Sequence, residues 1–337
     1  MPFVVGLAYN LKKDCPRTGN DPEDIAAEYE EQSTVNRIAK ALRAKGHRVV
    51  RLPYGADIPS RLKRSHVDIV FNIAEGWDGR NREAHVPAIL EICGVPYTGS
   101  DPLTLSLALD KSLAKMVMKA RGIPTPKFAV VRNEHDFPKI NLKFPIFIKP
   151  AYEGSSKGIR DSCKVDDQDQ LRQQVNWALN TYHQPILLEE FLPGREFTVG
   201  ILGNHDDLQV FPVMEIRPKK DISPEGFVYS YETKSQNLEQ FLCPAPIPKA
   251  LERKIKSIAV RAFQALECRD MARVDVRLDG NDSPFFLEIN PLPGLSSVSL
   301  FPLTALAAGI SFEELIDKIL MLAAARANLR IREEAVL

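Results

Sequence analysis

"MARVDVRLDGNDSPFFLEINPLPGL", residues 271–295, contains two runs in which polar and apolar residues alternate. Alternation with a period of two is typical of half-buried strands, and the Gly, Asn, Asp, Ser and Pro residues at 280–284 predict a turn between them. We therefore expect a β-hairpin. Antiparallel pairing of Leu278 with Phe285 would keep the apolar faces together, and that face would carry Phe285, Leu287 and Ile289.

This register brings acidic side chains face to face, with Asp275 opposite Glu288 and Arg273 opposite Asn290. Cross-strand Cβ atoms lie about 5 Å apart, and like charges there destabilise a sheet. One explanation is that Arg273 and Arg277 neutralise the acids by diagonal ion pairs. The other is a Mg²⁺ ion bound by the two carboxylates and the Asn290 amide oxygen, because Mg²⁺ prefers a few carboxylates together with substrate phosphates. The break into "PLPG" directly after Asn290 favours the metal.

The composition is that of an ordinary globular protein with two or three domains. The chain has 337 residues, with 44 Lys plus Arg balancing 44 Asp plus Glu, so no net charge attracts nucleic acid or an anionic membrane. No apolar run approaches the roughly 20 residues that span a bilayer, and the N-terminus lacks a signal-peptide pattern. Cysteine and histidine spacings predict neither disulfides nor a zinc site. We expect a cytoplasmic protein.

The first hundred residues alternate between strand and helix patterns, which predicts a small doubly wound α/β sheet. Ligand contacts in such sheets gather at the carboxyl ends of the strands, which points to Asn10, Asn72 and the loop at 75–85. The turn "PYTGSDP" marks a boundary. After it, the stretch at 101–122 predicts one helix capped by Asp101.

A lysine and a loop of small residues follow a strand at "FPIFIKPAYEGSSKGI", residues 144–159. The loop matches neither GxxxxGK[ST] nor GxGxxG, so neither of those phosphate motifs applies. Its glycines, Ser155 and Ser156 are nevertheless suited to covering a phosphate chain with backbone N–H groups and hydroxyls. A flexible surface loop is the alternative, and the neighbouring Lys149 favours phosphate.

The stretch "ILLEEFLPGREFTV", residues 186–199, is a strand that ends in two acids, an aromatic residue and a Pro-Gly turn. It is either an ordinary exit from a strand or a hinge that hydrogen-bonds a purine edge. In the second interpretation Glu196 binds the ribose hydroxyls.

These stretches, in this order and preceded by Lys111, resemble the ATP-grasp superfamily and, within it, the D-alanine–D-alanine ligases. The resemblance is strong over residues 90–320 and weak before them. It rests on the segments "GVPYTGSDPLTLSLALDK", "KPAYEGSSKGI", "EEFLPGREFTVGILG", "YETK", "CPAPI", "ARVDVRLD" and "LEINPLPGLSSVSLFP". It implies an α/β ATP-grasp fold with three subdomains, at 1–101, 102–193 and 194–325, and a homodimer.

The resemblance also implies an activity and a set of site residues. The activity is that of an ATP-dependent ligase that joins amino acids through an acyl phosphate, with Mg²⁺ as cofactor. Lys111, Lys149 and Ser156 would contact the phosphates, 189–192 the adenine and Glu196 the ribose. Asp275, Glu288 and Asn290 would bind magnesium. The catalytic groups would be Arg273, the N–H of Gly294, Ser155 and Lys234, with Ser299 near the carboxylate of the second substrate.

The departures from the family pattern lie where substrates are selected. Glu75 stands at the place of the family's usual histidine, and Ser235 at that of a tyrosine that would complete a tyrosine–serine–glutamate network. The N-terminal stretch that is typical of the family is also replaced, here by "NLKKDCPRTGNDPEDIAAEYEEQS". Candidate substrate contacts are therefore Glu30 or Glu31, Glu75, Arg80, Arg82, Glu83 and Ser235.

We expect an intact ATP half and a rebuilt amino-acid half. Two alternatives stay open. One is a D-alanine–D-alanine ligase of peptidoglycan synthesis with a divergent first-substrate loop. The other is a protein that binds ATP without catalysis.

Overall fold

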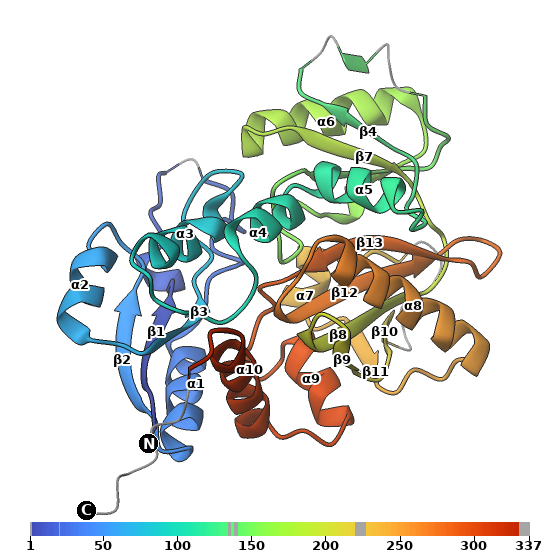
Figure 1. Ribbon diagram of the computed structural model, residues 1–337. Coiled ribbons are helices and arrows are strands. Elements are labelled where there is room, and N and C mark those ends of the chain that lie inside the picture. The colour runs from blue at the N-terminus through green and yellow to red at the C-terminus, as the bar shows by residue number, and fades with distance from the viewer. Residues whose placement is uncertain (1, 20, 134–135, 138–140, 220–226, 330–337) are drawn as a thin grey trace, which may run out of the picture.

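Three β-sheets define the architecture of the computed structural model, which describes residues 2–19, 21–133, 136–137, 141–219 and 227–329. A three-stranded parallel sheet, a four-stranded antiparallel sheet and a larger antiparallel sheet follow one another along the chain and occupy separate regions in Figure 1. Their strand orders are β2-β1-β3, β4-β7-β5-β6 and β11-β10-β8-β12-β13 with β9 beside β8.

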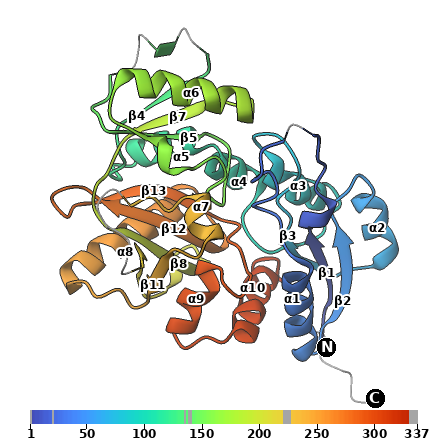
Figure 2. The same ribbon diagram turned by 180° about the vertical axis from the view of Figure 1, so that it is seen from behind.

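The N-terminal sheet is covered by helices on both faces. Its elements are β1 (Val4–Tyr9), the 3₁₀ helix η1 (Lys12–Asp14), α1 (Gln32–Ala44), β2 (Arg48–Pro53), α2 (Ile58–Ser65), β3 (Ile69–Ile73), the 3₁₀ helix η2 (Arg82–Ala84) and α3 (His85–Ile92). Strand β1 is almost wholly buried because α1 packs on one face and α2 with α3 on the other. The C-terminal helix α10 (Phe312–Arg326) lies beside α1 in both views, so distant parts of the chain share one core (Figures 1 and 2).

The two asparagines at the strand ends shape a loop. The Asn10 side chain accepts a hydrogen bond from the N–H of Gly76 at 3.1 Å, and Asn72 accepts from the N–H of Ala74 at 3.1 Å. Both asparagines are buried, and each uses its side-chain oxygen to bond a backbone N–H of the following loop, while the side-chain nitrogen of Asn10 has no partner among the described residues. They position the loop at 75–85, which carries the candidate substrate residues.

The stretch at 101–122, predicted as one helix, forms two: α4 (Pro102–Leu109) and α5 (Lys111–Ala120). The predicted cap is confirmed, since Asp101 accepts from the N–H of Thr104. The prediction of a single helix was wrong, because Asp110 has extended backbone and its side chain caps α5 by accepting hydrogen bonds from two N–H groups. This break places Lys111 at the first position of α5.

The central part builds its own small core from one sheet and one helix. Its elements are β4 (Phe128–Val131), β5 (Ile146–Pro150), the 3₁₀ helix η4 (Asp161–Cys163), β6 (Lys164–Val165), α6 (Gln168–Tyr182) and β7 (Ile186–Glu190). Helix α5 instead packs with Ala114 and Met118 into the core of the larger sheet. The subdomain boundaries at 101 and 193 stay predictions. Each of the three sheets lies within one of the three predicted subdomains, but the hydrophobic cores include residues from both sides of a boundary.

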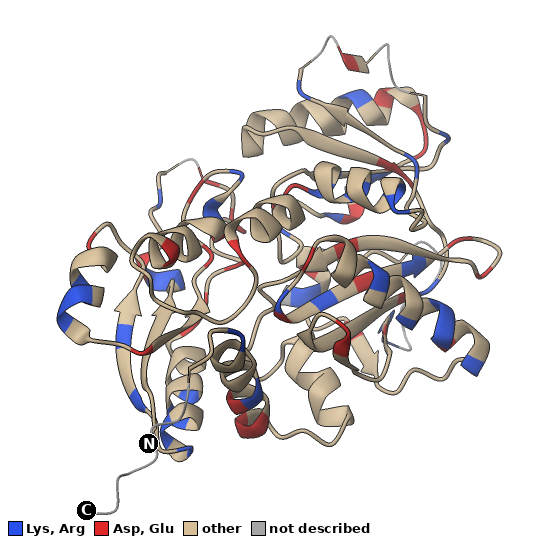
Figure 3. Cartoon of the chain, in the orientation of Figure 1, with Lys and Arg blue, Asp and Glu red and all other residues tan. Residues whose placement is uncertain are grey.

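The remaining part surrounds the larger sheet. Its elements are β8 (Glu196–Asn204), β9 (Asp207–Val210), β10 (Met214–Pro218), α7 (Tyr231–Ser235), β11 (Glu239–Leu242), α8 (Lys249–Ala265), β12 (Asp270–Leu278), β13 (Pro284–Asn290) and α9 (Leu300–Ala307). Lysines, arginines and acids are interspersed over all three parts (Figure 3). No helix among the described residues is long and apolar enough to cross a bilayer.

Strands β12 and β13 form the predicted hairpin with one difference in register. Asp275 pairs with Glu288 and Arg273 pairs with Asn290, as predicted. The pairing of Leu278 with Phe285 was wrong, since Leu278 pairs with Pro284.

A bulge explains the difference. The partners of Asp275 and Val276 are Glu288 and Phe286, so Leu287 is an extra residue on β13. Phe286 and Ile289 consequently point into the core, whereas Leu287 lines the pocket described below.

Candidate active site

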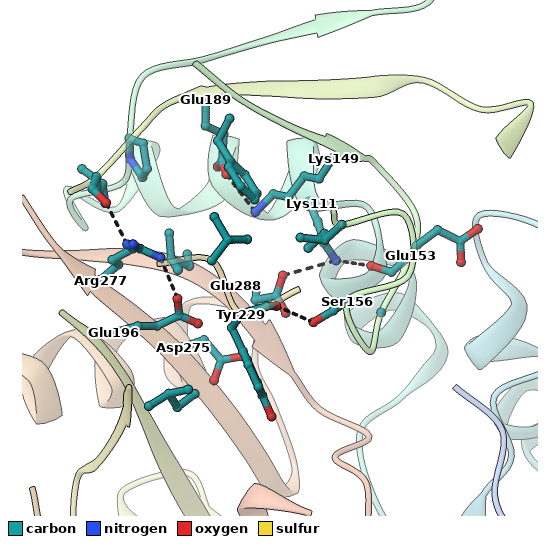
Figure 4. A pocket seen from close by; sticks show the side chains of 18 of the residues that line it. Lys111, Lys149, Glu153, Ser156, Glu189, Glu196, Tyr229, Asp275, Arg277 and Glu288 are labelled. Atoms are coloured by element: carbon teal, nitrogen blue, oxygen red, sulfur yellow. Dashed lines mark hydrogen bonds and ion pairs between the residues drawn. The ribbon is translucent and has the colours of Figure 1, made fainter. Parts of the chain in front are cut away.

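Two adjoining hollows lie at the junctions between the parts of the chain. The first, here called the pocket, lies between the central sheet and the hairpin (Figure 4). The second, here called the cavity, has a volume of about 750 Å³ and extends toward the N-terminal part. Residues that line both are Lys111, Gly154, Ser155, Tyr229, Lys234, Arg273 and Leu300.

Buried lysines line one side of the pocket. Lys149, at the end of β5, points to Glu189 of the neighbouring strand β7 at 2.8 Å (Figure 4). Burial opposes the charge on Lys149, but Glu189 and Glu288 raise its pKa above the ordinary value. Lys111 lies 3.4 Å from the carboxylate of Glu288 and contacts the carbonyl oxygen of Glu153.

One buried lysine was missed by the sequence reasoning. Lys115 is fully buried and also contacts Glu189, so a single carboxylate lies between two lysines. Burial lowers the pKa of Lys115 to about 8. The available signal was the spacing of four residues from Lys111, which puts both side chains on one face of a helix.

The two acids of the hairpin have different partners: Glu288 faces Lys111, whereas Asp275 is hydrogen bonded to neighbouring residues of the larger sheet. Asp275 accepts hydrogen bonds from Thr198 at 2.6 Å, from Arg273 at 2.9 and 3.1 Å and from the Asn290 amide at 3.3 Å. Burial disfavours the charged form of Glu288, but the surrounding cations lower its pKa to about 2. These cations are Lys111, Lys149, Arg273 and Lys234.

Only one of the two arginines neutralises an acid of the hairpin. Arg273 does contact Asp275, but Arg277 turns away from the acids. Its guanidinium donates to the Leu192 carbonyl at 2.7 Å and to Glu196 at 2.9 Å (Figure 4). The predicted ion pair between Arg277 and the acids of the hairpin was therefore wrong.

The donor groups fit a divalent cation together with a polyphosphate. The predicted magnesium ligands are the carboxylates of Asp275 and Glu288 and the Asn290 amide. Among the described residues, no cluster of three or more His, Cys, Asp or Glu side chains could hold a metal ion. A partial shell of this kind suits Mg²⁺, which usually keeps waters and phosphate oxygens. Four cations act electrostatically on Glu288, although Lys149 also pairs with Glu189 and Arg273 with Asp275. A bound polyphosphate would offer this group of cations further anionic partners.

Two segments cover the pocket from the solvent side. In the loop at 151–159, Ser155 and Ser156 both have left-handed backbone, with φ of 50° and 62°. The Ser156 hydroxyl donates to the Tyr229 carbonyl at 3.0 Å, so this loop contacts the segment that leads into α7 (Figure 4). Lys234 of α7 lines both hollows, and burial together with Arg273 lowers its pKa to about 8.

The predicted adenine hinge borders the pocket at residues 189–192. The side chain of Glu189 points to the two lysines rather than along the hinge, and the N–H groups of Glu190 and Phe191 already bond to carbonyls within the protein. The Arg277 guanidinium lies 4.9 Å from the centre of the Phe191 ring. Contact of this segment with adenine stays a prediction.

Gly294 and Ser299 lie together on the cavity wall. A Cβ at position 294 would lie 2.9 Å from the Ser299 hydroxyl oxygen, so glycine permits the close approach. Ser299 bonds to Ser296 at 2.8 and 3.1 Å. Asn290 lines the same wall.

The opposite wall of the cavity is acidic. Glu28, Glu75 and Glu83 line it, and Glu75 and Glu83 are hydrogen bonded to each other. Burial and repulsion by neighbouring acids raise the pKa of Glu75 well above its ordinary value. Burial raises the pKa of Glu83 to about 7.

Three predicted substrate contacts do not lie in the cavity. Arg80 is largely exposed and pairs with Asp110 at 2.8 Å. Glu31, at the N-cap position of α1, points to solvent and pairs with Lys12 at 3.3 Å. Arg82 is buried and contacts other side chains instead. The side chain of Ser235 lies outside what the structure describes.

Glu30, the alternative to Glu31, is turned inward. Its carboxylate accepts hydrogen bonds from the side chain of Thr34 and from the N–H of Leu295, next to Gly294. Burial raises its pKa. Glu30 therefore supports the turn at Gly294 from behind, while Glu23 and Glu28 are the acids of the preceding segment that line the cavity.

Sequence comparison identifies relatives over most of the chain. A family model described as the D-ala D-ala ligase C-terminus matches residues 117–321. A D-alanine–D-alanine ligase of Carboxydothermus hydrogenoformans is 37% identical over 299 residues, which cover 86% of this chain and 92% of the relative. The uncharacterized protein y4sG of Sinorhizobium fredii is 41% identical over 264 residues, or 78% of this chain and 76% of that protein.

Solved structures match over almost the whole length. The D-alanine–D-alanine ligase from Bacillus anthracis, complexed with ATP, has a TM-score of 0.74 at 21% identity and covers 97% of this chain and 99% of its own. VanG D-Ala:D-Ser ligase from Enterococcus faecalis has a TM-score of 0.72 at 22% identity, with coverages of 96% and 100%. These likenesses confirm the predicted ATP-grasp fold. Together with the sequence matches, they establish that the chain belongs to the D-alanine–D-alanine ligase family.

Proposed function

We propose that this ATP-dependent ligase joins two amino acids through a peptide bond, and that its acidic cavity wall selects a first substrate other than D-alanine. The observation that carries the ligase chemistry is the group of four cations that act electrostatically on Glu288, opposite Asp275, with Lys111 at 3.4 Å from its carboxylate. Relatives named D-alanine–D-alanine ligase, aligned over most of the chain, support the reaction class.

The first step under this proposal activates a carboxylate, which is a poor electrophile. Lys111 and Lys149 reduce the repulsion between the carboxylate and the terminal phosphate of ATP. Lys234 faces the same point from α7. Transfer of the phosphate gives an acyl phosphate and ADP.

The second step is attack by an amine, with release of phosphate. Arg273 and the N–H of Gly294 line the cavity where the amine would enter, and both donate to the developing oxyanion. An acyl phosphate also reacts with water, so the loop at 151–159 and α7 would exclude water while it persists.

A magnesium ion would be held by Asp275, Glu288 and Asn290. When bound, it would add positive charge beside the phosphates. Cytoplasmic localisation and a homodimer are further proposals that follow from the family resemblance alone.

The altered specificity rests on the acidic wall of the cavity. Glu28 is already paired with Arg82, so the group that would favour a cation is the pair formed by Glu75 and Glu83, which are hydrogen bonded to each other. A D-alanine–D-alanine ligase with a divergent loop is the second candidate. This candidate is favoured by sequence identity to named ligases, such as 37% identity in an alignment that covers 92% of the Carboxydothermus enzyme.

The test is amino-acid-dependent release of ADP in the presence of Mg²⁺, measured for D- and L-amino acids singly and in pairs. Mass spectrometry would identify the product, and Arg273→Gln is the inactive control. We expect D-alanine alone to be a poor substrate and another pair to be efficient. Efficient use of D-alanine alone would refute the altered specificity and support the second candidate. Tight ATP binding without ADP release for every pair would overturn the ligase proposal.

A further inference from the structure

Two carboxylates of the N-terminal part bind backbone amides of the loop at 151–159. Asp24 accepts from the N–H of Gly158 at 2.7 Å, and Glu28 accepts from the N–H of Gly154. A Cβ at position 154 would lie 2.8 Å from the Glu28 carboxylate, so glycine allows this docking. The loop that covers the pocket is therefore attached at two points, Gly154 and Gly158, to a segment more than a hundred residues earlier in the chain.

Arg82 lies at the centre of the same contact. One of its terminal nitrogens donates to both oxygens of Glu28 at 2.7 Å and to Glu153 at 3.2 Å. The other donates to the carbonyl of Tyr152 at 2.7 Å. A single guanidinium thus connects η2 of the N-terminal part to both side chain and backbone of the loop.

The groups in this contact are removed from water, and the three carboxylates are met by two cations and by backbone N–H groups. Arg82 is 4% exposed, and Asp24, Glu28, Glu153 and Lys157 are each exposed by less than a tenth. Lys157 pairs with Glu153 at 3.0 Å. The Glu153 side chain points away from the pocket in Figure 4, although its carbonyl faces Lys111.

We propose that Arg82 is a positioning residue which, together with Asp24 and Glu28, fixes the loop at 151–159 over the pocket. We call these three residues and their loop partners the latch. Glu28 also lines the cavity, so the latch joins the wall of the substrate site to the cover of the pocket. Arg82 suits this role because its planar fork reaches several acceptors at once.

The inference rests on the proposed function only in assuming that the loop covers phosphates. It explains how the loop is held although the tyrosine of the expected tyrosine–serine–glutamate network is absent. Ser155 and Ser156 keep left-handed backbone between two anchored glycines, so their N–H groups are held in one arrangement.

Limited trypsin digestion of the full-length protein, with and without ADP, tests the latch directly. Lys157 lies inside the latch and is 6% exposed, so the bond after it should resist cleavage in the wild type. Arg82→Gln should raise the rate of cleavage after Lys157 by about tenfold or more, the effect expected from loss of charge-assisted hydrogen bonds in a buried site. Arg82→Lys keeps the charge but not the fork and should be intermediate.

Arg326→Gln is the matched control, because Arg326 pairs with buried Asp270 at 2.9 Å elsewhere in the fold. It should lower the melting temperature without exposing Lys157. If Arg82→Gln fails to fold, Asp24→Ala removes one anchor and should give the same cleavage.

Steady-state kinetics give a second readout. Arg82→Lys should raise the KM for ATP and lower kcat by up to about a hundredfold, the cost of a small misplacement at a reacting centre. The KM for the second amino acid should not change.

Equal melting-temperature losses in Arg82→Gln and Arg326→Gln, with Lys157 protected in both, would reduce Arg82 to a structural residue and overturn the proposal. The digestion needs no turnover, so its outcome does not depend on the ligase reaction.

Discussion

Glu75 and Glu83 are hydrogen bonded to each other on the cavity wall, at a place largely closed to water. Two adjacent carboxyl groups cannot both ionise readily, so one proton is retained near neutral pH. A substrate ammonium group would replace that proton and leave both acids charged. The pair is therefore suited to a cationic group of the first substrate.

Replacing Glu83 with Gln should change how stability depends on pH. Burial raises the pKa of Glu83 to about 7 from an ordinary value of 4.5. The folded state therefore binds more protons, and the contribution to stability is complete below the ordinary pKa and lost as pH rises through about 7. Glu83→Gln should gain about 2–3 kcal/mol relative to wild type between about pH 5 and 8. Urea unfolding at both pH values measures this change.

The control for that experiment is Glu313→Gln, which removes an exposed carboxylate on α10. Its stability relative to wild type should stay constant over the same pH range. A constant difference for Glu83→Gln as well would mean that Glu83 ionises like an ordinary surface acid.

Glu189→Gln should destabilise the protein and weaken nucleotide binding. The change leaves Lys115 and Lys149 buried without their shared carboxylate. Removing one partner from a buried ion pair typically costs about 3–5 kcal/mol. Chemical denaturation gives the stability, and titration calorimetry with ADP gives the affinity.

The neighbouring Glu190 provides the comparison. Its carboxylate is partly exposed and lies 4.0 Å from Lys127, so Glu190→Gln should cost less than about 1 kcal/mol. Similar losses in the two variants would argue against a special role for Glu189.

Asp275→Asn and Glu288→Gln should each lower ligase activity by more than about a hundredfold, since each removes a charged ligand from the proposed magnesium site. Chelation by EDTA should abolish wild-type activity, and added Mg²⁺ should restore it. Binding of Mn²⁺ in the presence of ADP, followed by electron paramagnetic resonance, checks the site without turnover.

Asp282→Asn is the matched variant at the exposed turn of the same hairpin and should bind Mn²⁺ normally. Unchanged Mn²⁺ affinity in both Asp275→Asn and Glu288→Gln would rule out these acids as ligands.

Glu196→Ala should remove discrimination between ATP and 2′-deoxy-ATP, because it removes the hydrogen-bond acceptor. Glu196 lines the pocket and is held by Arg277 at 2.9 Å. A hydrogen bond from a ribose hydroxyl to this carboxylate would make 2′-deoxy-ATP about tenfold poorer in kcat/KM for the wild type. The variant should use both nucleotides equally, at the lower rate. Equal use by the wild type itself would place the ribose elsewhere.

The hairpin and the lysines could be predicted because their signals are local. Alternation in two adjacent runs was enough to pair Asp275 with Glu288, and the strand pattern before Pro150 located Lys149. The bulge at Leu287 was not predictable, because it depends on which neighbouring apolar residues fill the core.

Contacts between distant segments had no such signal. Arg82 and Glu28 are 54 residues apart in sequence, and their pairing depends on how the N-terminal part meets the loop at 151–159. The same reason explains the placement of Arg80. Its position in a charged loop suggested a substrate contact, but the break between α4 and α5 puts Asp110 within 2.8 Å of it.

Lys234 should impose an alkaline limit on the use of ATP. Burial and the charge of Arg273 lower its pKa to about 8, so the side chain is cationic below that pH and neutral above it. If the cation contacts the terminal phosphate, kcat/KM for ATP falls as pH rises through about 8, by up to tenfold per pH unit. Lys234→Arg keeps its charge at every accessible pH, because arginine does not lose its proton in proteins. The variant should therefore retain its activity where the wild type declines, even if its rate at neutral pH is lower. The measurement is kcat/KM for ATP from about pH 6.5 to 10 at saturating amino acids, with Lys249→Arg on α8 as the control. If kcat/KM of Lys234→Arg falls at the same pH and as steeply as that of the wild type, the ionisation belongs to another group.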